Sequence, residues 1–249
     1  METVKQTDRQ VIIMYTINFH EPIHIHFIGI GGISMSGLAE ILLKEHFTSS
    51  GSDAKESELT KHLSELGVTV FYGQRAENIT DGVQLVVYTA AIAQDNPEFV
   101  RAKELGLPML SRAELLGQIM DNYRNSIAVA GTHGKTTTTS MISQILLTAA
   151  CDPTITVGGI LKAINGNLRV GKSSYFVAEA CEYTNSFLHF YPKYSIILNV
   201  EAEHLDFFKD IQDVRNSFHH FASNTKPDGM ILVNGDIENC GELTAGLTQ

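Results

Sequence analysis

One stretch of this chain reads Val129-Ala130-Gly131-Thr132-His133-Gly134-Lys135-Thr136-Thr137-Thr138-Thr139. It follows an apolar segment that begins at Ser126, and an amphipathic helical pattern comes after it. Glycines between a strand and a helix let backbone N–H groups surround phosphate oxygens, and the helix N-terminus adds partial positive charge. The order therefore predicts a strand–turn–helix unit of an α/β protein with an anion site at the turn.

The side chains in this turn favour a nucleoside triphosphate. Lys135 can reach the outer phosphates, and the hydroxyl of Thr136 is placed to ligate Mg²⁺. The pattern is the compact G-x-x-G-K-T form, because Val129 stands where the common G-x-x-x-x-G-K-[ST] loop has glycine. We expect the phosphates to contact the turn and the start of the helix, namely Gly131, Thr132, His133, Gly134, Lys135, Thr136 and Thr137. The alternative is an ordinary turn with a surface lysine.

Composition limits the class of protein. A chain of 249 residues suits one large domain or two ordinary ones. A net charge of −10 without a Lys/Arg cluster argues against a nucleic-acid partner. The apolar runs are too short to cross a bilayer, so we expect no membrane insertion. Three unevenly spaced cysteines indicate reduced thiols and a cytoplasmic protein. Residues 1–20 are expected to form an extension, with Met14 as an alternative start, and the sequence leaves the oligomeric state open.

Short apolar runs alternate with helical patterns along the rest of the chain, which is typical of parallel sheets flanked by helices. Candidate strands occupy residues 23–28, 68–72, 85–88, 108–110, 126–130, 175–178, 194–200 and 230–233, with another that ends at Asp53. Candidate helices occupy residues 37–46, 56–66, 97–105, 113–120 and 211–221, besides the one after the phosphate loop. The polar residues 121–125 read as a linker, which divides the chain into domains at 21–122 and 123–249.

The first domain opens with a second glycine motif, Phe27-Ile28-Gly29-Ile30-Gly31-Gly32-Ile33-Ser34-Met35-Ser36-Gly37. Glycines directly after a strand let the backbone approach a diphosphate, and Asp53 lies where a ribose-binding acid is expected. The third glycine of the dinucleotide fingerprint is replaced by Ser34. The motif therefore leaves three alternatives: a nicotinamide dinucleotide, another diphosphate-linked nucleoside, or a turn needed only for helix packing.

Polar residues follow two later strands, at the edge of an α/β sheet where ligands bind. Glu179 is the preferred Mg²⁺ ligand, and Glu182 either assists it or faces solvent. Asn199 could hold a phosphate or substrate oxygen. His204 could ligate a second Mg²⁺ or contact substrate, although Mg²⁺ prefers oxygen ligands. Of the other histidines, His24 and His26 on the first strand are expected to be packing residues, and His219 and His220 to be solvated.

The two glycine motifs together, about a hundred residues apart, resemble those of the Mur ligases. Further agreement comes from Tyr88-Thr89-Ala90-Ala91-Ile92, Asp95-Asn96-Pro97-Glu98, Gly158-Gly159 and residues 199–206. The resemblance implies a Rossmann-like N-terminal domain for a UDP-sugar, a P-loop-type central ATPase domain that is incomplete here, and a missing C-terminal domain. It also implies that this chain is a fragment, inactive alone.

The activity implied by the resemblance is ATP-dependent amide synthesis, in which L-alanine is joined to the lactyl carboxylate of UDP-N-acetylmuramate through an acyl phosphate in peptidoglycan precursor synthesis. Lys135 and His204 would be catalytic, and Thr136, Glu179 and His204 would hold Mg²⁺. The UDP-sugar would contact Gly29, Gly31, Gly32, Ser34, Met35, Ser36, Asp53 and Thr89. A murein peptide-recycling ligase of the same family, a nicotinamide-dependent oxidoreductase and a non-catalytic nucleotide-binding module remain alternatives.

Overall fold

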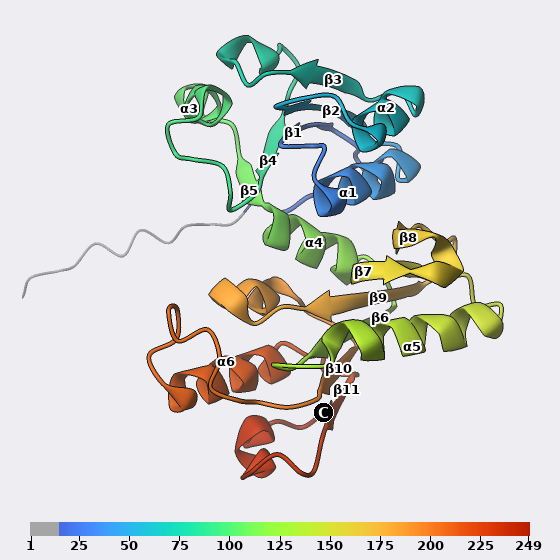
Figure 1. The fold of residues 1–249 in the computed structure, drawn as a ribbon, viewed down its shortest axis with the longest axis vertical. Coiled ribbons are helices and arrows are strands. Elements are labelled where there is room, and N and C mark those ends of the chain that lie inside the picture. The colour runs from blue at the N-terminus through green and yellow to red at the C-terminus, as the bar shows by residue number, and fades with distance from the viewer. Residues whose placement is uncertain (1–14) are drawn as a thin grey trace, which may run out of the picture.

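Two parallel-stranded sheets, one after the other along the chain, form the framework of the molecule in the computed structural model (Figure 1). The structure describes residues 15–249. The first sheet is the upper, blue-to-green part of Figure 1, and the second is the lower, green-to-red part. Within the described residues, no helix is both long and apolar enough to cross a membrane.

The first sheet has the strand order β3-β2-β1-β4-β5 and is parallel throughout. Its strands are β1 (His24–Ile28), β2 (Thr48–Asp53), β3 (Thr69–Tyr72), β4 (Leu85–Tyr88) and β5 (Met109–Ser111). Its helices are α1 (Ile33–Lys44), α2 (Glu58–Glu65), α3 (Pro97–Glu104) and α4 (Arg112–Asp121). The order turns at β1, which has β2 on one side and β4 on the other. In such a sheet ligands bind outside the carboxyl ends of the strands, at the turning point.

The second sheet has the order β11-β10-β6-β9-β7-β8. Its strands are β6 (Asn125–Ala130), β7 (Thr154–Leu161), β8 (Gly166–Arg169), β9 (Tyr175–Ala180), β10 (Tyr194–Ile197) and β11 (Met230–Val233). Helix α5 (Lys135–Thr148) follows β6, and α6 (Ile211–Ser223) precedes β11. β6 lies between β9 and β10, so the residues that follow these three strands meet at one edge.

Three details differ from the sequence prediction. The second sheet is not wholly parallel, because β8 pairs antiparallel with β7. Only four residues connect these strands, which is too short for a crossover helix and suits a hairpin. Helix α1 begins at Ile33 instead of residue 37, because Gly32 is its N-cap. Residues 15–20 belong to the first domain, since Ile17 is buried and its N–H donates to Gln118 Oε1; the rest of the predicted extension lies outside the described residues.

The helices differ in how they begin. Side chains cap four of them, each of which also has an acidic residue in its first turn: α2 by Ser57, α3 by Asn96, α4 by Ser111 and α6 by Asp210. The two helices that follow the glycine motifs, α1 and α5, have neither a side-chain cap nor a first-turn acid. Uncapped first-turn N–H groups without a nearby carboxylate favour an external anion.

The two sheets are joined by close backbone packing as well as by the linker. A Cβ at Gly117 on α4 would lie 2.0 Å from the carbonyl oxygen of His189, so only glycine permits this approach. On α1, a Cβ at Gly37 would lie 2.8 Å from the Leu168 side chain on β8. These two contacts set α1 and α4 of the first domain against the second.

Candidate functional site

The loop between β6 and α5 adopts conformations that favour glycine. Gly131 has φ 147° and Gly134 has φ 80°, and Gly134 is the N-cap of α5. Asn199, which follows β10, holds the loop between them: its Oδ1 accepts from His133 N at 2.7 Å and its Nδ2 donates to His133 O at 3.1 Å. The carbonyl of Asn199 accepts from Thr132 N at 3.3 Å. Asn199 is thus a clamp on the loop, and both polar atoms of its side chain are occupied.

The N–H groups left for a ligand include those of the first helical turn. Those of Lys135, Thr136 and Thr137 have no hydrogen-bond partner among residues 15–249. They face an open hollow of about 310 Å³ that is lined by Thr132, His133, Gly134, Lys135, Thr136 and Thr137. The loop therefore presents unpaired donors to the space where the sequence predicts phosphates, although the N–H groups of Thr132 and His133 are already used.

Lys135 folds back toward the sheet. Its Nζ donates to Gly131 O at 2.5 Å and to Glu182 Oε2 at 2.8 Å, and the side chain is 16% exposed. Glu182 is 2% exposed and also lies 3.4 Å from His204 Nε2. Of the two alternatives for Glu182, the solvent-facing one is therefore wrong: this carboxylate balances the charge of Lys135, because an unpaired buried charge is costly.

Thr136 and Glu179 lie together, as the prediction of a metal site requires. Thr136 Oγ1 donates to Glu179 Oε2 at 3.1 Å, and Gly158 N donates to Glu179 Oε1 at 2.6 Å. A Cβ at Gly158 would lie 2.8 Å from the same carboxylate, so a larger residue there would displace the Glu179 side chain. A hydroxyl and a carboxylate at the start of the helix are the oxygen donors that Mg²⁺ prefers.

His204 does not join this pair. Its ligating nitrogen lies within 4.8 Å of carboxylate oxygens of Glu182 and Glu203, a group that does not include Glu179. Its φ of 55° is left-handed, and its ring packs against that of Tyr183, with centroids 4.6 Å apart and planes tilted by 37°. The predicted ligands therefore lie in two places: Thr136 and Glu179 lie together, and His204, which the sequence assigns to a second ion or to substrate, lies beside Glu182 and Glu203.

The first glycine loop, residues 29–32, is built in a similar way. The N–H groups of Gly29 and Ile30 donate to Ser52 O at 2.8 and 2.9 Å. Gly31 N donates to Asp53 Oδ2 at 2.8 Å. Asp53 thus fastens the loop to the end of β2, a role different from the ribose contact that the sequence predicts. Residues 33–35, in the first turn of α1, have backbone N–H groups without a partner in the described structure.

Other predicted UDP-sugar contacts lie in less direct positions. The side chain of Met35 is 1% exposed and belongs to the core, so only its backbone can face a ligand. The hydroxyl of Ser36 donates to Ile33 O at 3.0 Å within the helix. Thr89, after β4, accepts from Ala91 N at 3.3 Å. The N–H of Gly32 donates to Gly29 O. Of the predicted set, Ser34 lines one cavity between the domains and Ser36 lines another.

The cavity that Ser34 lines, of about 340 Å³, extends from the start of α1 to Glu179, which accepts a hydrogen bond from Thr136 in the first turn of α5. Ser34 and Arg112 line it from the first domain, and Gly158 and Glu179 line it from the second. Arg112 is the first residue of α4, and its Nη1 donates to Ser34 Oγ at 3.2 Å. Within the described residues, no carboxylate lies within 4.0 Å of its guanidinium. Burial lowers the pKa of Arg112, but a guanidinium keeps its charge at neutral pH. The cavity therefore holds a cation that lacks an anion.

Sequence reasoning missed Arg112 and the ion-pair role of Glu182. Arg112 stands in no motif, and its position beside Ser34 arises only when α4 packs near α1. Glu182 carried a usable signal, since it follows the strand that ends near Glu179 and a buried lysine needs a countercharge.

Comparison with known proteins places this geometry in a family. Residues 24–124 match the model described as "Mur ligase family, catalytic domain", and residues 129–248 match the "Mur ligase middle domain". The UDP-N-acetylmuramate–L-alanine ligase of Agathobacter rectalis is 70% identical over 236 residues, which cover 95% of this chain and 51% of that protein. The chain spans about half the length of the curated relatives it matches.

Two solved structures of ligases are similar to this chain in sequence and in fold. The UDP-N-acetylmuramate-alanine ligase of Thermotoga maritima is 33% identical, with a TM-score of 0.76, over 89% of this chain and 51% of that one. The UDP-N-acetylmuramate:L-alanyl-gamma-D-glutamyl-meso-diaminopimelate ligase of Neisseria meningitides is 30% identical, with a TM-score of 0.79, over 90% of this chain and 75% of that one. The sequence, the two glycine loops and these matches together show that the chain belongs to the Mur ligase family.

Proposed function

We propose that this chain forms the nucleotide-sugar-binding and ATP-binding parts of an enzyme that joins L-alanine to UDP-N-acetylmuramate at the cost of ATP. The observation that carries the proposal is the cavity between the domains, because it extends from the uncapped N-terminus of α1 to Glu179, whose carboxylate is bonded to Thr136 at the uncapped N-terminus of α5. A ligase of this kind needs two anionic substrates side by side, and a single nucleotide leaves one of the loops unexplained.

The second loop is proposed to hold the phosphates of ATP. The free N–H groups of Lys135, Thr136 and Thr137 would contact phosphate oxygens, as at other helix N-termini. Lys135 would turn from Glu182 toward the outer phosphates, and Glu182 would then stay paired with His204, 3.4 Å away. A lysine that neutralises the transferring phosphoryl group supplies electrostatic stabilisation.

Magnesium fits the donors that the loop offers. Thr136 and Glu179 present oxygens at the start of α5, and would hold Mg²⁺ against the triphosphate. When bound, the ion would offset phosphate charge. Glu182, Glu203 and His204 form a separate group with one nitrogen and two carboxylates, which suits Mg²⁺ less well.

The first loop is proposed to hold the diphosphate of the sugar nucleotide. The N–H groups of residues 33–35 point out of the first turn of α1, and Arg112 supplies a charge beside Ser34. The sugar acid would then extend into the cavity toward Glu179 and the ATP loop. The substrates would meet there, and positioning of this kind supplies much of the rate of such reactions.

The proposed reaction has two steps. A lactyl carboxylate oxygen attacks the γ-phosphorus of ATP, and the bond between the γ-phosphorus and the oxygen that bridges it to the β-phosphate breaks. The products of this step are ADP and an acyl phosphate. The amine of L-alanine then attacks the acyl carbon, and the tetrahedral intermediate expels phosphate as the amine loses a proton. Phosphorylation is needed because a carboxylate oxygen is a poor leaving group.

Calorimetry tests the proposal against its alternatives. We expect the chain to bind UDP-N-acetylmuramate and not NAD⁺. Binding of NAD⁺ without binding of the UDP-sugar would favour an oxidoreductase and overturn the proposal. The Neisseria relative favours a second candidate, a ligase that takes a peptide in place of L-alanine. The two candidates are separated by assays of the full-length enzyme with L-alanine and with L-alanyl-gamma-D-glutamyl-meso-diaminopimelate as the amine substrate.

A further inference from the structure

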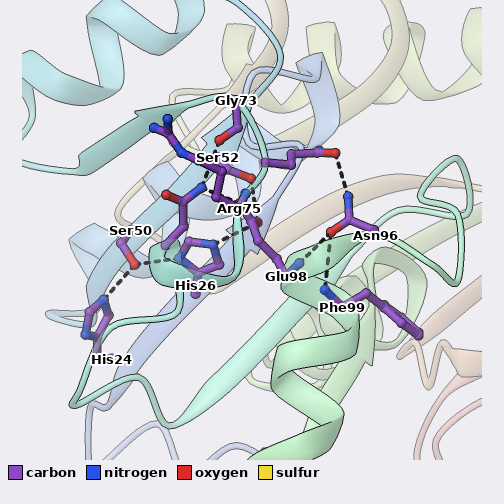
Figure 2. Close-up of polar contacts among 11 residues, drawn as sticks. His24, His26, Ser50, Ser52, Gly73, Arg75, Asn96, Glu98 and Phe99 are labelled. Carbon is purple, nitrogen blue, oxygen red and sulfur yellow. Dashed lines mark hydrogen bonds and ion pairs between the residues drawn. The ribbon is translucent and has the colours of Figure 1, made fainter.

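A buried polar cluster in the first domain plays no part in the reaction proposed above (Figure 2). It consists of His26 on β1, Ser50 and Ser52 on β2, Asn78 after β3, and Glu98 on α3, and we call it the Glu98 cluster. His26, Ser52 and Glu98 are 0% exposed. Glu98 belongs to the Asp95-Asn96-Pro97-Glu98 motif, so this is a motif that the two loops leave unexplained.

Glu98 accepts four hydrogen bonds from three parts of the domain. Its Oε2 accepts from Ser52 Oγ at 2.6 Å and lies 3.2 Å from His26 Nε2. Its Oε1 accepts from Asn78 Nδ2 at 2.5 Å and from Arg75 N at 3.3 Å. Burial opposes the charged form, yet the hydrogen bonds from His26, Ser52 and Asn78 hold the pKa of Glu98 below its ordinary value. The carboxylate is therefore charged at neutral pH, with all its acceptor positions directed at protein groups.

The cluster is linked to the first glycine loop through Ser52. The hydroxyl of Ser52 donates to Glu98, and the carbonyl of the same residue accepts the N–H groups of Gly29 and Ile30. The next residue, Asp53, accepts from Gly31 and from Gly73 through separate oxygens. The end of β2 thus holds the loop, and Glu98 is bonded to the side chain of Ser52 at this end of β2.

We propose that Glu98 is a positioning residue for the diphosphate of the nucleotide sugar. It fixes Ser52, Ser52 fixes residues 29 and 30, and the loop then directs the free N–H groups of residues 33–35 at the ligand. The inference rests on the proposed function, since it assumes that the first loop binds a UDP-sugar. An apolar residue in this place would fill the space, but would leave Ser52 Oγ, His26 and Asn78 without their acceptor.

The test compares Glu98→Gln and Ser52→Ala with Phe99→Leu, the adjacent core position on α3, at a temperature where circular dichroism finds each chain folded. Calorimetry with UDP-N-acetylmuramate is expected to show about 10-fold weaker binding in Glu98→Gln and Ser52→Ala, with no further loss in the double variant. Affinity for MgATP should be unchanged in all three. Phe99→Leu should bind the UDP-sugar as the unaltered chain does.

Amide hydrogen exchange distinguishes a specific effect on the first glycine loop from a general loss of stability. The N–H groups of residues 29–31 should exchange about 10-fold faster in Glu98→Gln than in Phe99→Leu. Equal UDP-sugar affinity in Glu98→Gln and the unaltered chain, or equal weakening by Phe99→Leu, would overturn the role of Glu98. If Glu98→Gln does not fold, Ser52→Ala decides in the same way. Failure of the unaltered chain to bind the UDP-sugar would instead overturn the proposed function, and the inference with it.

Discussion

The two glycine loops are both held in place by hydrogen bonds to a neighbouring strand or the segment after it, but the bonding residues differ. In both, two or three N–H groups of the loop are bonded to residues at or just after the end of a neighbouring strand, and the first turn of the helix keeps its donors free. In residues 29–32 the partner is β2, with Asp53 as the direct acceptor; in residues 131–134 it is Asn199 after β10. Only the second loop has its own lysine. We infer that the second loop manages the charge of a reacting phosphate, whereas the first only holds a ligand in place.

The largest expected effect comes from the lysine. Lys135→Ala should weaken binding of MgATP by about 100-fold, because it removes charge-assisted hydrogen bonds to phosphate, and should leave UDP-N-acetylmuramate affinity unchanged. Calorimetry with each ligand measures both. Lys172→Ala, an exposed lysine of the same domain, is the matched control. Loss of both affinities together would show that the loops do not act separately.

The next effect concerns the arginine beside the first loop. Arg112→Ala should weaken UDP-N-acetylmuramate binding by about 10-fold and leave MgATP binding intact, since the guanidinium lies against Ser34 and has no carboxylate partner in the described structure. Arg101→Ala, on the exposed side of α3, is the control. An unchanged affinity for the UDP-sugar in Arg112→Ala would remove Arg112 from the site.

Acid stability probes the support of the first loop. The pKa of Glu98 in the folded chain is lower than its ordinary value of 4.5. The charged carboxylate therefore contributes its full stabilisation of the fold above pH 4.5, and this contribution is lost as the pH falls through the pKa of the folded chain. Urea unfolding between pH 6 and about pH 3.5 should therefore reveal a smaller loss of stability in Glu98→Gln than in the unaltered chain. Glu104→Gln, an exposed change on the same helix, should behave as the unaltered chain. Parallel curves for Glu98→Gln would contradict the hydrogen-bonded carboxylate.

The smallest effect separates backbone from side chain in α1. Met35→Leu should change UDP-N-acetylmuramate affinity by less than about twofold, because the Met35 side chain lies in the core and similar volumes are tolerated there. The same titration measures it. A change as large as that expected for Arg112→Ala would place the Met35 side chain in the ligand site.

Much of this architecture could be predicted from the sequence, for identifiable reasons. Apolar runs before Gly29 and Gly131, with helical patterns after them, specify strand–loop–helix units locally. The sequence does not predict strands β7 and β8, because their glycines and polar residues show no clear alternation of apolar and polar positions. The phosphate loop was recognised, but which of its N–H groups remain free depends on Asn199, 66 residues away from His133.

The remaining site residues depend on tertiary packing. Arg112 lies beside Ser34 only because α4 packs near α1, and no local sequence pattern signals that packing. Glu98 looks like an ordinary first-turn acid of a capped helix, yet it is buried among donors from β1, β2 and the segment after β3. The sequence predicts that His26 is a packing residue; its ring is buried and in addition contacts Glu98 and Ser50.

Simultaneous binding is the most direct test of two separate sites. The chain would first be saturated with a non-hydrolysable ATP analogue and Mg²⁺, and then titrated with UDP-N-acetylmuramate in a calorimeter. The account predicts one UDP-sugar per chain, in the presence of the analogue as in its absence. Displacement of the analogue by the UDP-sugar, or no second binding event, would contradict it.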